Sequence, residues 1–408
     1  FIFFLLLFVL FPTSGFSSDL IKTQGTNGSS EITLDLLIQI GEPLFIHYCS
    51  HCHGINGDGE GFNAEYLDRE PANLTDPEFM AKRKDSRIYR VINKGGPEVR
   101  KSNLMPAFGN TLSDLEIWSL VAYVRSLSEG DLKDFPDDLN PERPKRSKFT
   151  KRELADFITW VKSGGLDEAS EEGELLVNNK KSCPACHAIE DEGGALGPDL
   201  TRAGLLYSPE WLFRWLNNPQ EFKPNTKMPN HGLSVEEIKA ITSFLMGLTG
   251  EEEELIKFTV KGNSEKGKKL FFDLDGKAKC AKCHKVNQNG GEIGPDLSFV
   301  GTSRTKEFLA ESILEPSKVL TSGFATVSVL SKDGKFFNGV QKKLKKDSFD
   351  LVDAAGKVSS IKQDRINKFK FADKSLMPDN FKTVLSEQEV ADILSYLKTL
   401  NLSNSKLK

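Results

Sequence analysis

The sequence predicts a mainly α fold: three tandem helical domains, the third carrying a small β-meander or barrel as an insertion. Three observations predict this architecture. A Cys-x-x-Cys-His run occurs three times and accounts for all six cysteines of the 408-residue chain. A helix of nearly the same sequence follows each run. One segment after the third run is rich in β-branched and aromatic residues.

The three runs have the spacing of covalent haem attachment, in which two thiols bind the haem and the histidine ligates its iron. Zinc sites place their cysteine pairs about 15–20 residues apart, whereas these pairs are more than ninety residues apart. A thiol redox motif or a disulfide would not require the following histidine. We expect three covalently bound haem c groups. The candidate thioether residues are Cys49, Cys52, Cys183, Cys186, Cys280 and Cys283, and the candidate axial ligands are His53, His187 and His284.

Each predicted domain closes with an amphipathic helix. Its first turn carries a capping box, in which a serine hydroxyl and a glutamate three residues later satisfy the first amide groups. Apolar residues then recur at i, i+3, i+4 and i+7. A shorter amphipathic segment that begins with glycine precedes each run and predicts a leading helix. The boxes are Ser113/Glu116, Ser234/Glu237 and Ser386/Glu389, and the glycines are Gly41, Gly173 and Gly267.

A Met-Pro pair lies between each run and its closing helix, at Met105, Met228 and Met377. A thioether sulfur is soft and neutral, and Met/His ligation raises the reduction potential of a haem. We therefore expect these three methionines to be the sixth ligands. The alternative is that they only fill the core, which is the role we expect for Met246.

The histidines that remain allow at most one site with two histidine ligands. They are His47, His51 and His231. His47 and His51 lie too close to the first run to reach the opposite face of its haem. We expect His231, three residues after Met228, to lie at the surface or beside the haem propionates, with ligation as the alternative.

The N-terminus is apolar from Phe1 to Pro12, and small and polar residues follow. This pattern is typical of a secretory signal peptide. Its charged start and the initiator Met are absent from the sequence, so we expect a truncated leader; an uncleaved N-terminal anchor is the alternative. The overall composition, with 27% charged residues and a net charge of −4, gives no indication of nucleic-acid binding. We expect a periplasmic protein, attached to a membrane only if the N-terminal segment is retained.

The boundaries follow from these motifs. We expect a signal peptide or anchor at 1–17, domains at 30–130, 167–250 and 263–408, and linkers at 131–166 and 251–262. The first linker has a potential short helix at 150–162. The β insertion falls at about 320–373, where Lys and Arg outnumber acidic residues roughly two to one. It would shield a haem or dock an acidic partner.

With its CxxCH runs, Met-Pro pairs and aromatic closing helices, the chain from about residue 31 onward resembles class I cytochrome c domains. The resemblance implies that backbone carbonyls near Pro198 and Pro295 orient the histidines. The first domain keeps Pro71 at the matching place. The third domain, with its insertion, is similar to a haem-binding domain found in planctomycete and verrucomicrobial proteins.

These features favour a triheme electron carrier over an enzyme. The expected partners are redox proteins: other cytochromes, or dehydrogenase, terminal oxidase or reductase subunits. The chain would then resemble the cytochrome subunit of an oxidoreductase complex. The alternative is a haem enzyme, such as a peroxidase, with one open iron site.

Overall fold

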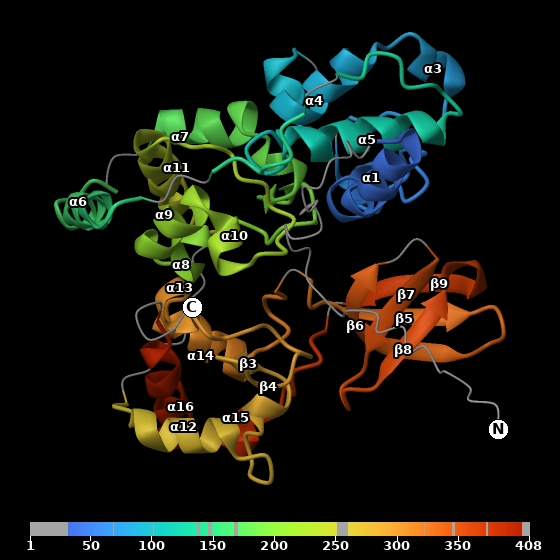
Figure 1. Cartoon of the computed structure of the whole chain (residues 1–408). Coiled ribbons are helices and arrows are strands. Elements are labelled where there is room, and N and C mark those ends of the chain that lie inside the picture. The colour runs from blue at the N-terminus through green and yellow to red at the C-terminus, as the bar shows by residue number, and fades with distance from the viewer. Residues whose placement is uncertain are drawn as a thin grey trace, which may run out of the picture.

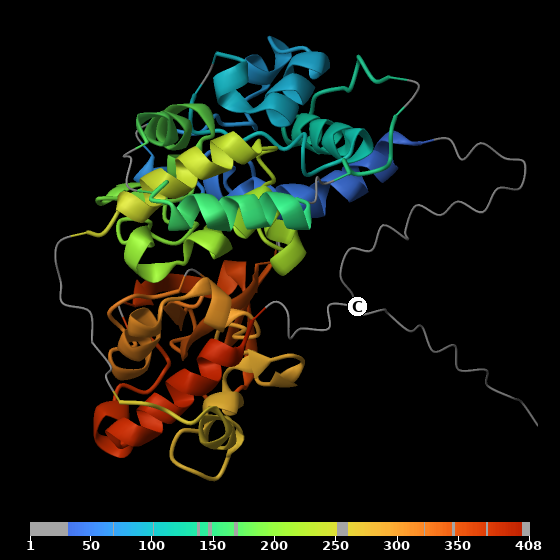
Figure 2. The same cartoon turned by 90° about the vertical axis from the view of Figure 1, so that its left-hand side faces the viewer.

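The computed structural model describes residues 32–401 except 68, 101, 137–138, 146–148, 167–169, 251–259, 322, 345–346 and 373. The predicted signal peptide lies outside these residues. The described chain forms three helical units, blue to teal, green to olive and yellow to red in Figure 1, and a separate orange sheet. Figure 2 shows the third unit below the first two. No helix in the described part is long and apolar enough to cross a membrane.

The first unit is built around two helices that lie side by side, α1 (Leu34–Tyr48) and α5 (Asp114–Leu127). Their contact buries Phe45, Ile117 and Val121. Three short helices and one longer one complete the unit: α2 (Ser50–His53), η2 (Ala64–Tyr66), α3 (Pro77–Ala81) and α4 (Asp85–Glu98).

The second and third units share one plan. The second contains α6 (Lys151–Lys162), α7 (Glu171–Leu175), η3 (Leu176–Lys180), η4 (Cys183–Ala185), β1 (Ala188–Ile189), β2 (Glu192–Gly193), α8 (Ala203–Leu206), α9 (Pro209–Asn217), α10 (Pro219–Phe222) and α11 (Val235–Gly247). The third contains α12 (Ser264–Phe272), η5 (Cys280–Lys282), β3 (Lys285–Val286), β4 (Asn289–Gly290), α13 (Val300–Ser303), α14 (Lys306–Leu314), α15 (Phe381–Val384) and α16 (Glu387–Thr399). From the attachment run to α9 and α14, equivalent residues differ by 97 positions.

A glycine allows the leading and closing helices of each unit to touch. A Cβ on Gly41 would lie 2.0 Å from the carbonyl oxygen of Ser119. The corresponding distances are 2.1 Å between Gly173 and Ala240 and 1.9 Å between Gly267 and Asp392. Such contacts are too short for any side chain, so glycine is required where the two backbones cross.

The capping boxes lie where the sequence predicts them. In α5, α11 and α16 the N-cap serine accepts from the third amide, and the glutamate accepts from the amide of the serine. These predictions are confirmed. A capping box depends only on residues within one helical turn, so the sequence alone is enough to predict it.

Residues 326–372 form a five-stranded antiparallel sheet in the order β8-β7-β6-β5-β9. The strands are β5 (Thr326–Ser331), β6 (Phe336–Leu344), β7 (Ser348–Val352), β8 (Val358–Lys362) and β9 (Ile366–Ala372), with the turn η6 (Gln363–Arg365) before β9. Val327, Val329, Leu351 and Ile361 form a small core on one face. The sheet stands beside the helices of the third unit and opposite the first unit, where Phe371 packs 6.5 Å from the ring of Phe62.

The segment 131–166, predicted to be a linker, is largely part of the flanking units. Leu132, Phe135 and Leu139 pack against the core of the first unit. Helix α6 is present as the sequence suggests, but its Phe157 is completely buried in the core of the second unit. The linker prediction was therefore wrong here, because apolar residues spaced among charged ones still bury one face. The second predicted linker, 251–262, lies mostly outside the described residues.

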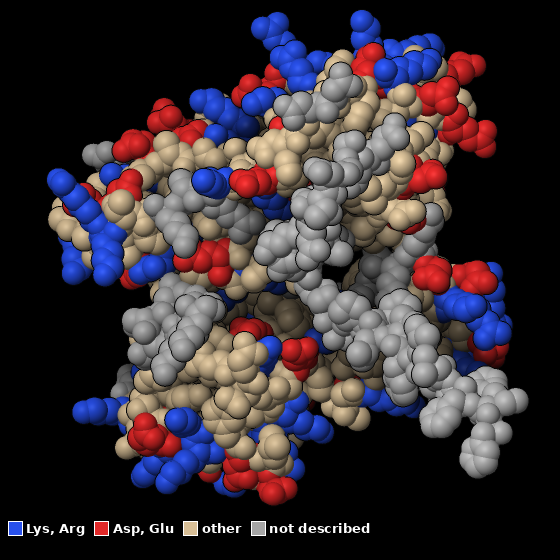
Figure 3. All heavy atoms as spheres, in the orientation of Figure 1, with Lys and Arg blue, Asp and Glu red and all other residues tan. Residues whose placement is uncertain are grey.

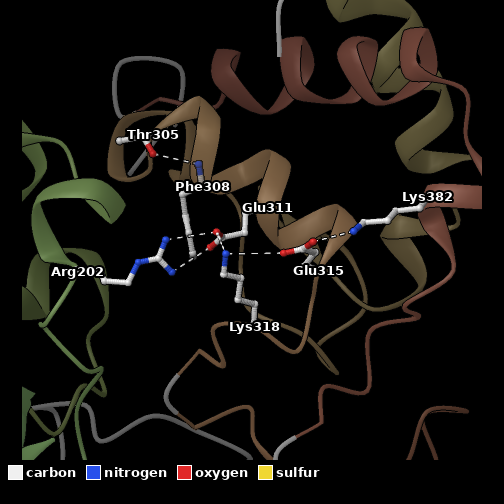
Figure 4. Close-up of polar contacts among 7 residues, drawn as sticks. All are labelled: Arg202, Thr305, Phe308, Glu311, Glu315, Lys318 and Lys382. Carbon is white, nitrogen blue, oxygen red and sulfur yellow. Dashed lines mark hydrogen bonds and ion pairs between the residues drawn. The ribbon is translucent and has the colours of Figure 1, made fainter. Parts of the chain in front are cut away.

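A buried ion group joins the second and third units (Figure 4). The carboxylate of Glu311 on α14 is 1% exposed and lies 3.3 Å from the guanidinium of Arg202 and 3.0 Å from Lys318 Nζ. On the outer surface in Figure 3, by contrast, acidic and basic side chains are mixed. The pair between Arg202 and Glu311 is therefore one contact that holds the two units together, whereas the visible face offers no patch of a single sign.

Candidate haem-binding sites

Each Cys-x-x-Cys-His run folds as a single tight turn. The backbone N–H of the histidine donates to the carbonyl of the first cysteine over 2.9–3.0 Å at His53, His187 and His284. This turn brings the two thiols and the imidazole of one run to the same place. The residue before the first cysteine has a left-handed backbone at Ser182 (φ 58°) and Lys279 (φ 49°). The turn is therefore set by the chain that leads into it.

All six cysteines are free thiols. Burial raises the pKa of every one of them, to about 12 for Cys49, Cys183, Cys186 and Cys280. The thiols are therefore neutral, and none is paired in a disulfide. Within the described part of the chain, no group of three or more His, Cys, Asp or Glu side chains converges as a zinc site would need.

The three candidate axial histidines are held in one orientation. Nδ1 lies 3.0 Å from the carbonyl oxygen of Ala72 for His53, 2.7 Å from that of Pro198 for His187, and 2.9 Å from that of Pro295 for His284. A carbonyl only accepts, so Nδ1 carries the proton and Nε2 keeps its lone pair. Burial lowers the pKa of all three imidazoles. A neutral imidazole with a free Nε2 is the form that ligates a metal.

In the first unit the acceptor is the backbone carbonyl of Ala72. The sequence predicts Pro71 as the residue equivalent to Pro198 and Pro295, and this prediction is wrong by one residue. In each unit a side chain accepts a hydrogen bond from the amide two residues later, and these bonds give the correct alignment of the three units. Asn73 accepts from the amide of Thr75, as Asp199 accepts from that of Thr201 and Asp296 from that of Ser298. Ala72 is therefore equivalent to Pro198 and Pro295, and counting back from Leu74 would have shown this.

Two glycines lie against the histidine rings. A Cβ on Gly197 would be 2.5 Å from Cε1 of His187, and one on Gly294 would be 2.7 Å from Cε1 of His284. In these two units any side chain would push the ring away from its carbonyl. The first unit has Pro71 at the equivalent position, and the carbonyl of Ala72 holds its ring in the same way. The pattern Gly-Pro-Asp-Leu, which the second and third units share, is the sequence feature that could have indicated this close contact.

The three Met-Pro pairs lie in loops fixed by backbone bonds. Gly96 N donates to the carbonyl of Met105 over 2.8 Å, just after Gly95 (φ 75°) breaks the helical path of α4. The amide of Met228 donates to Thr226 Oγ1, and that of Met377 to Ser375 Oγ. All three side chains pack at the edge of their unit's core.

The sulfur of Met228 has a polar neighbour. Trp215 Nε1 lies 3.0 Å from Sδ and donates to it. A thioether sulfur has two lone pairs, so one remains for a metal. The sequence analysis did not find Trp215, because the indole comes from α9 and reaches the Met-Pro loop only in the folded unit.

One cavity of about 4390 Å³ connects the sites. It is several times larger than a typical ligand pocket of about 300–1,000 Å³. Four cysteines of the second and third runs line it together with His187, His284, Met228 and Met377. In the first unit its walls include Gly54 and Pro106, the neighbours of His53 and Met105, which are not among its lining residues. The sheet contributes Val340, Phe349 and Phe371.

His231 is partly buried and also lines this cavity. Burial, together with the nearby charges of Lys181 and His187, lowers its pKa to about 4. The second unit therefore presents both Met228 and a neutral His231 near His187.

These residues fit covalent haem c. Free thiol pairs, imidazoles with a free Nε2, soft thioether groups and a large, partly apolar cavity are the donor set and surroundings that a haem needs. The residues that would hold it are Cys49, Cys52, His53 and Met105; Cys183, Cys186, His187 and Met228; and Cys280, Cys283, His284 and Met377.

Comparison with known families finds two models. Residues 37–124 match the family described as cytochrome c oxidase, cbb3-type, subunit III, and residues 170–249 and 264–332 match the cytochrome c family. The last match ends at residue 332, directly after β5, so β6 to β9 lie between the matched part of the third unit and its Met377 and α16.

Two curated proteins are similar over parts of the chain. Cytochrome c oxidase subunit 2 of Bacillus sp. (strain PS3) is 35% identical over 117 residues, which are 23% of this chain and 32% of that protein. The cbb3-type cytochrome c oxidase subunit CcoP of Rubrivivax gelatinosus is 37% identical over 95 residues, 23% of this chain and 27% of that protein. The chain thus spans about a third of the length of these relatives.

One solved structure, a reducing HAO-like protein complex of Kuenenia stuttgartiensis, aligns with 52% of this chain and 96% of its own, at 20% identity and a TM-score of 0.19.

Proposed function

Starting from the premise that this chain is a c-type cytochrome with several cytochrome c domains, we propose that it is an exported triheme electron carrier. Each of its units would hold one haem c through two thioether bonds, a histidine and a methionine. Haem c supplies a reversible one-electron couple. The protein supplies the ligands, insulation from water and surfaces for docking.

The observation that carries this proposal is the repeated histidine geometry. In three separate units an imidazole donates Nδ1–H to a backbone carbonyl and leaves Nε2 free. Such bonding fixes the tautomer and the ring plane and strengthens the imidazole as a ligand. One such histidine could be a buried structural residue. Three of them, each directly after a thiol pair, indicate three sites of one kind.

The Met-Pro loops support electron transfer over catalysis. A methionine opposite each histidine would leave no open position for a substrate, and iron with six fixed ligands changes its charge with little rearrangement. A peroxidase needs one open position on its iron, so a methionine ligand at every site would not suit that alternative.

The proposed partners are redox proteins in an oxidoreductase or oxidase complex. The two similar curated proteins are both oxidase subunits, which supports this class of partner. The apolar residues 1–12 support export.

Counting and classifying the haems tests the proposal. We expect three haems per purified chain in the pyridine haemochrome assay and the weak red charge-transfer band of Met-ligated ferric haem. Fewer than three haems, or no such band, would overturn the proposal. Rapid binding of carbon monoxide by one reduced haem in the unmodified protein would favour the alternative of a haem enzyme.

Single substitutions assign the ligands. Met105→Ala, Met228→Ala and Met377→Ala should each convert one haem to a high-spin form that binds carbon monoxide. Met246→Leu is the matched control, since Met246 packs against the core of the second unit outside a Met-Pro pair. His231→Ala distinguishes the two candidates of the second unit: a high-spin haem in this variant and not in Met228→Ala would make His231 the ligand.

A further inference from the structure

The amide of Asn63 lies between the first two attachment runs. Its side chain is completely buried. Nδ2 lies 3.3 Å from Sγ of Cys52 in the first run and 2.8 Å from the carbonyl oxygen of Ala185 in the second. Ala185 stands between Cys183 and Cys186, so a single amide group touches both attachment sites.

Every polar atom of this amide is used, and two of its three hydrogen bonds cross to the second unit. Oδ1 accepts from the backbone N–H of Ala195 over 2.8 Å, and the two Nδ2 protons point to Cys52 and Ala185. The backbone N–H of Asn63 donates to the carbonyl of His51, which ties the residue to the first run. A buried amide group held by three hydrogen bonds, on a backbone that is itself held, has one position and one orientation.

A second contact brings the same two sites together. Ser182, directly before the second run, donates Oγ–H to the carbonyl oxygen of Met105, the candidate sixth ligand of the first site, over 3.4 Å. The first two candidate sites are therefore joined at Asn63 and at Ser182.

We propose that the first and second haem sites form a directly coupled pair and that the amide of Asn63 links them and raises the potential of the first. This inference rests on the proposed function. In the holoprotein Cys52 Sγ is a thioether that still has a lone pair for Nδ2–H. A hydrogen bond to a sulfur that is bonded to the cofactor withdraws electron density and favours the reduced state.

The redox step is a simple exchange. His53 and His187 would each hold one haem, and the two sites would exchange single electrons, one site being oxidised by one unit as the other is reduced. The exchange would break no bond and transfer no proton or group. The short hydrogen-bonded route from Cys52 through Asn63 to Ala185 would carry this exchange.

The test uses the full holoprotein and three variants. Asn63→Leu keeps the size of the side chain and removes all three of its hydrogen bonds. Asn63→Asp keeps the acceptor for Ala195 and replaces the donor with a negative charge. Thr111→Val is the matched control, because Thr111 Oγ1 accepts from Asn230 N over 2.8 Å across the same pair of units but touches no cysteine.

The measurements are the midpoint potential of each site and the rate of exchange between the first two. The ε-methyl NMR resonances of the ligating methionines report each site separately, and the site whose resonance is lost in Met105→His is the first. We expect Asn63→Leu to lower the potential of the first site and to slow the exchange, and Asn63→Asp to lower that potential further. Thr111→Val should change neither quantity.

Equal effects of Asn63→Leu and Thr111→Val would show that Asn63 only docks the units and would overturn the proposal. Unchanged potentials in both Asn63 variants would do the same. If Asn63→Leu does not fold, Asn63→Asp decides alone by the potential of its first site. Three haems and intact Met resonances in these proteins would leave the proposed function standing even if the coupling fails.

Discussion

Ser208 and Thr305 occupy equivalent positions in the second and third units, and each donates its hydroxyl to the other unit. Ser208 Oγ lies 2.6 Å from the carbonyl oxygen of Thr302, and Thr305 Oγ1 lies 2.8 Å from that of Leu205. The two carbonyls are themselves equivalent. Between the two hydroxyls, Tyr207 forms an isolated bridge with Arg304, whose guanidinium lies 3.9 Å over the tyrosine ring. The two units therefore dock through a pseudo-twofold contact made of the same segment from each.

Loss of either hydroxyl should weaken the contact and one helix together. Ser208 caps α9 and Thr305 caps α14, in addition to their bonds across the interface. Ser208→Ala and Thr305→Ala should each cost about 1 kcal/mol for the cap and about 1 kcal/mol for the bond to the other unit. The free energy of unfolding, measured with denaturant, reports the sum of the two losses. The control is Ser234→Ala, which removes the cap of α11 alone. A loss in Ser208→Ala no larger than in the control would contradict a contribution from the interface.

Helix crossings in the repeat depend on glycine. In Gly173→Ala the new Cβ would lie 2.1 Å from the carbonyl oxygen of Ala240, so α7 must move away from α11. We expect a lower thermal midpoint and less haem in the second unit, seen as a smaller haem count per chain. Gly247→Ala, at the end of α11, meets no atom within 4 Å and is the control. If both variants behave alike, the close crossing is not what requires the glycine.

The sequence predicts well what depends on neighbouring residues. The capping boxes at Ser113, Ser234 and Ser386 follow from one turn of chain, and the structure has all three. It predicts poorly what depends on distant residues. Phe157 lies in a segment that the sequence predicts as a linker, yet it is buried. Its partner is Phe213 on α9, whose ring centroid is 4.2 Å away, and this distant contact is not visible in the local sequence.

The same reason explains what the site prediction missed. The thiols, histidines and methionines have a fixed spacing and can be found in the sequence. Asn63 and Trp215 act on the candidate sites only through folded contacts at Cys52 and Met228. The shift from Pro71 to Ala72 is a different error, since the equivalent turn at Asn73 is visible in the sequence itself.

The hydrogen bond from Trp215 should distinguish the second site from the others. Donation from Nε1 to Sδ of Met228 withdraws electron density from the sulfur, which weakens it as a donor to ferric iron. Trp215→Phe should therefore lower the midpoint potential of the second site, measured by a potentiometric titration that follows its Met resonance. In the control, Trp211→Phe, the substituted ring is stacked 5.6 Å from that of Trp215, and the bond to Met228 is kept. An equal shift in the two variants would assign the effect to packing instead.

Acid should weaken the first unit through Asp85. Its side chain is 1% exposed, and burial alone would raise the pKa of this carboxyl group. Bonds from the backbone amides of Asp134 and Lys133 and from Arg125 outweigh that effect and lower the pKa below its usual value. A carboxylate whose pKa is lower in the folded state stabilises that state above the unfolded pKa of about 3.9. The contribution is lost as the pH falls from there through the folded pKa.

Asp85→Asn should therefore remove part of the acid dependence. The free energy of unfolding of the first unit, measured with denaturant at several pH values from 6 downward, should fall more steeply below about pH 4 in the parent than in the variant. At neutral pH the variant should be less stable, because Arg125 is then buried without its anion. The control is Asp156→Asn, in an exposed pair with Arg152, and it should follow the parent. Parallel curves for the parent and Asp85→Asn would show that this carboxylate does not govern the acid response. The amides of residues 133 and 134 would then hold that segment against the first unit without any need for the charge.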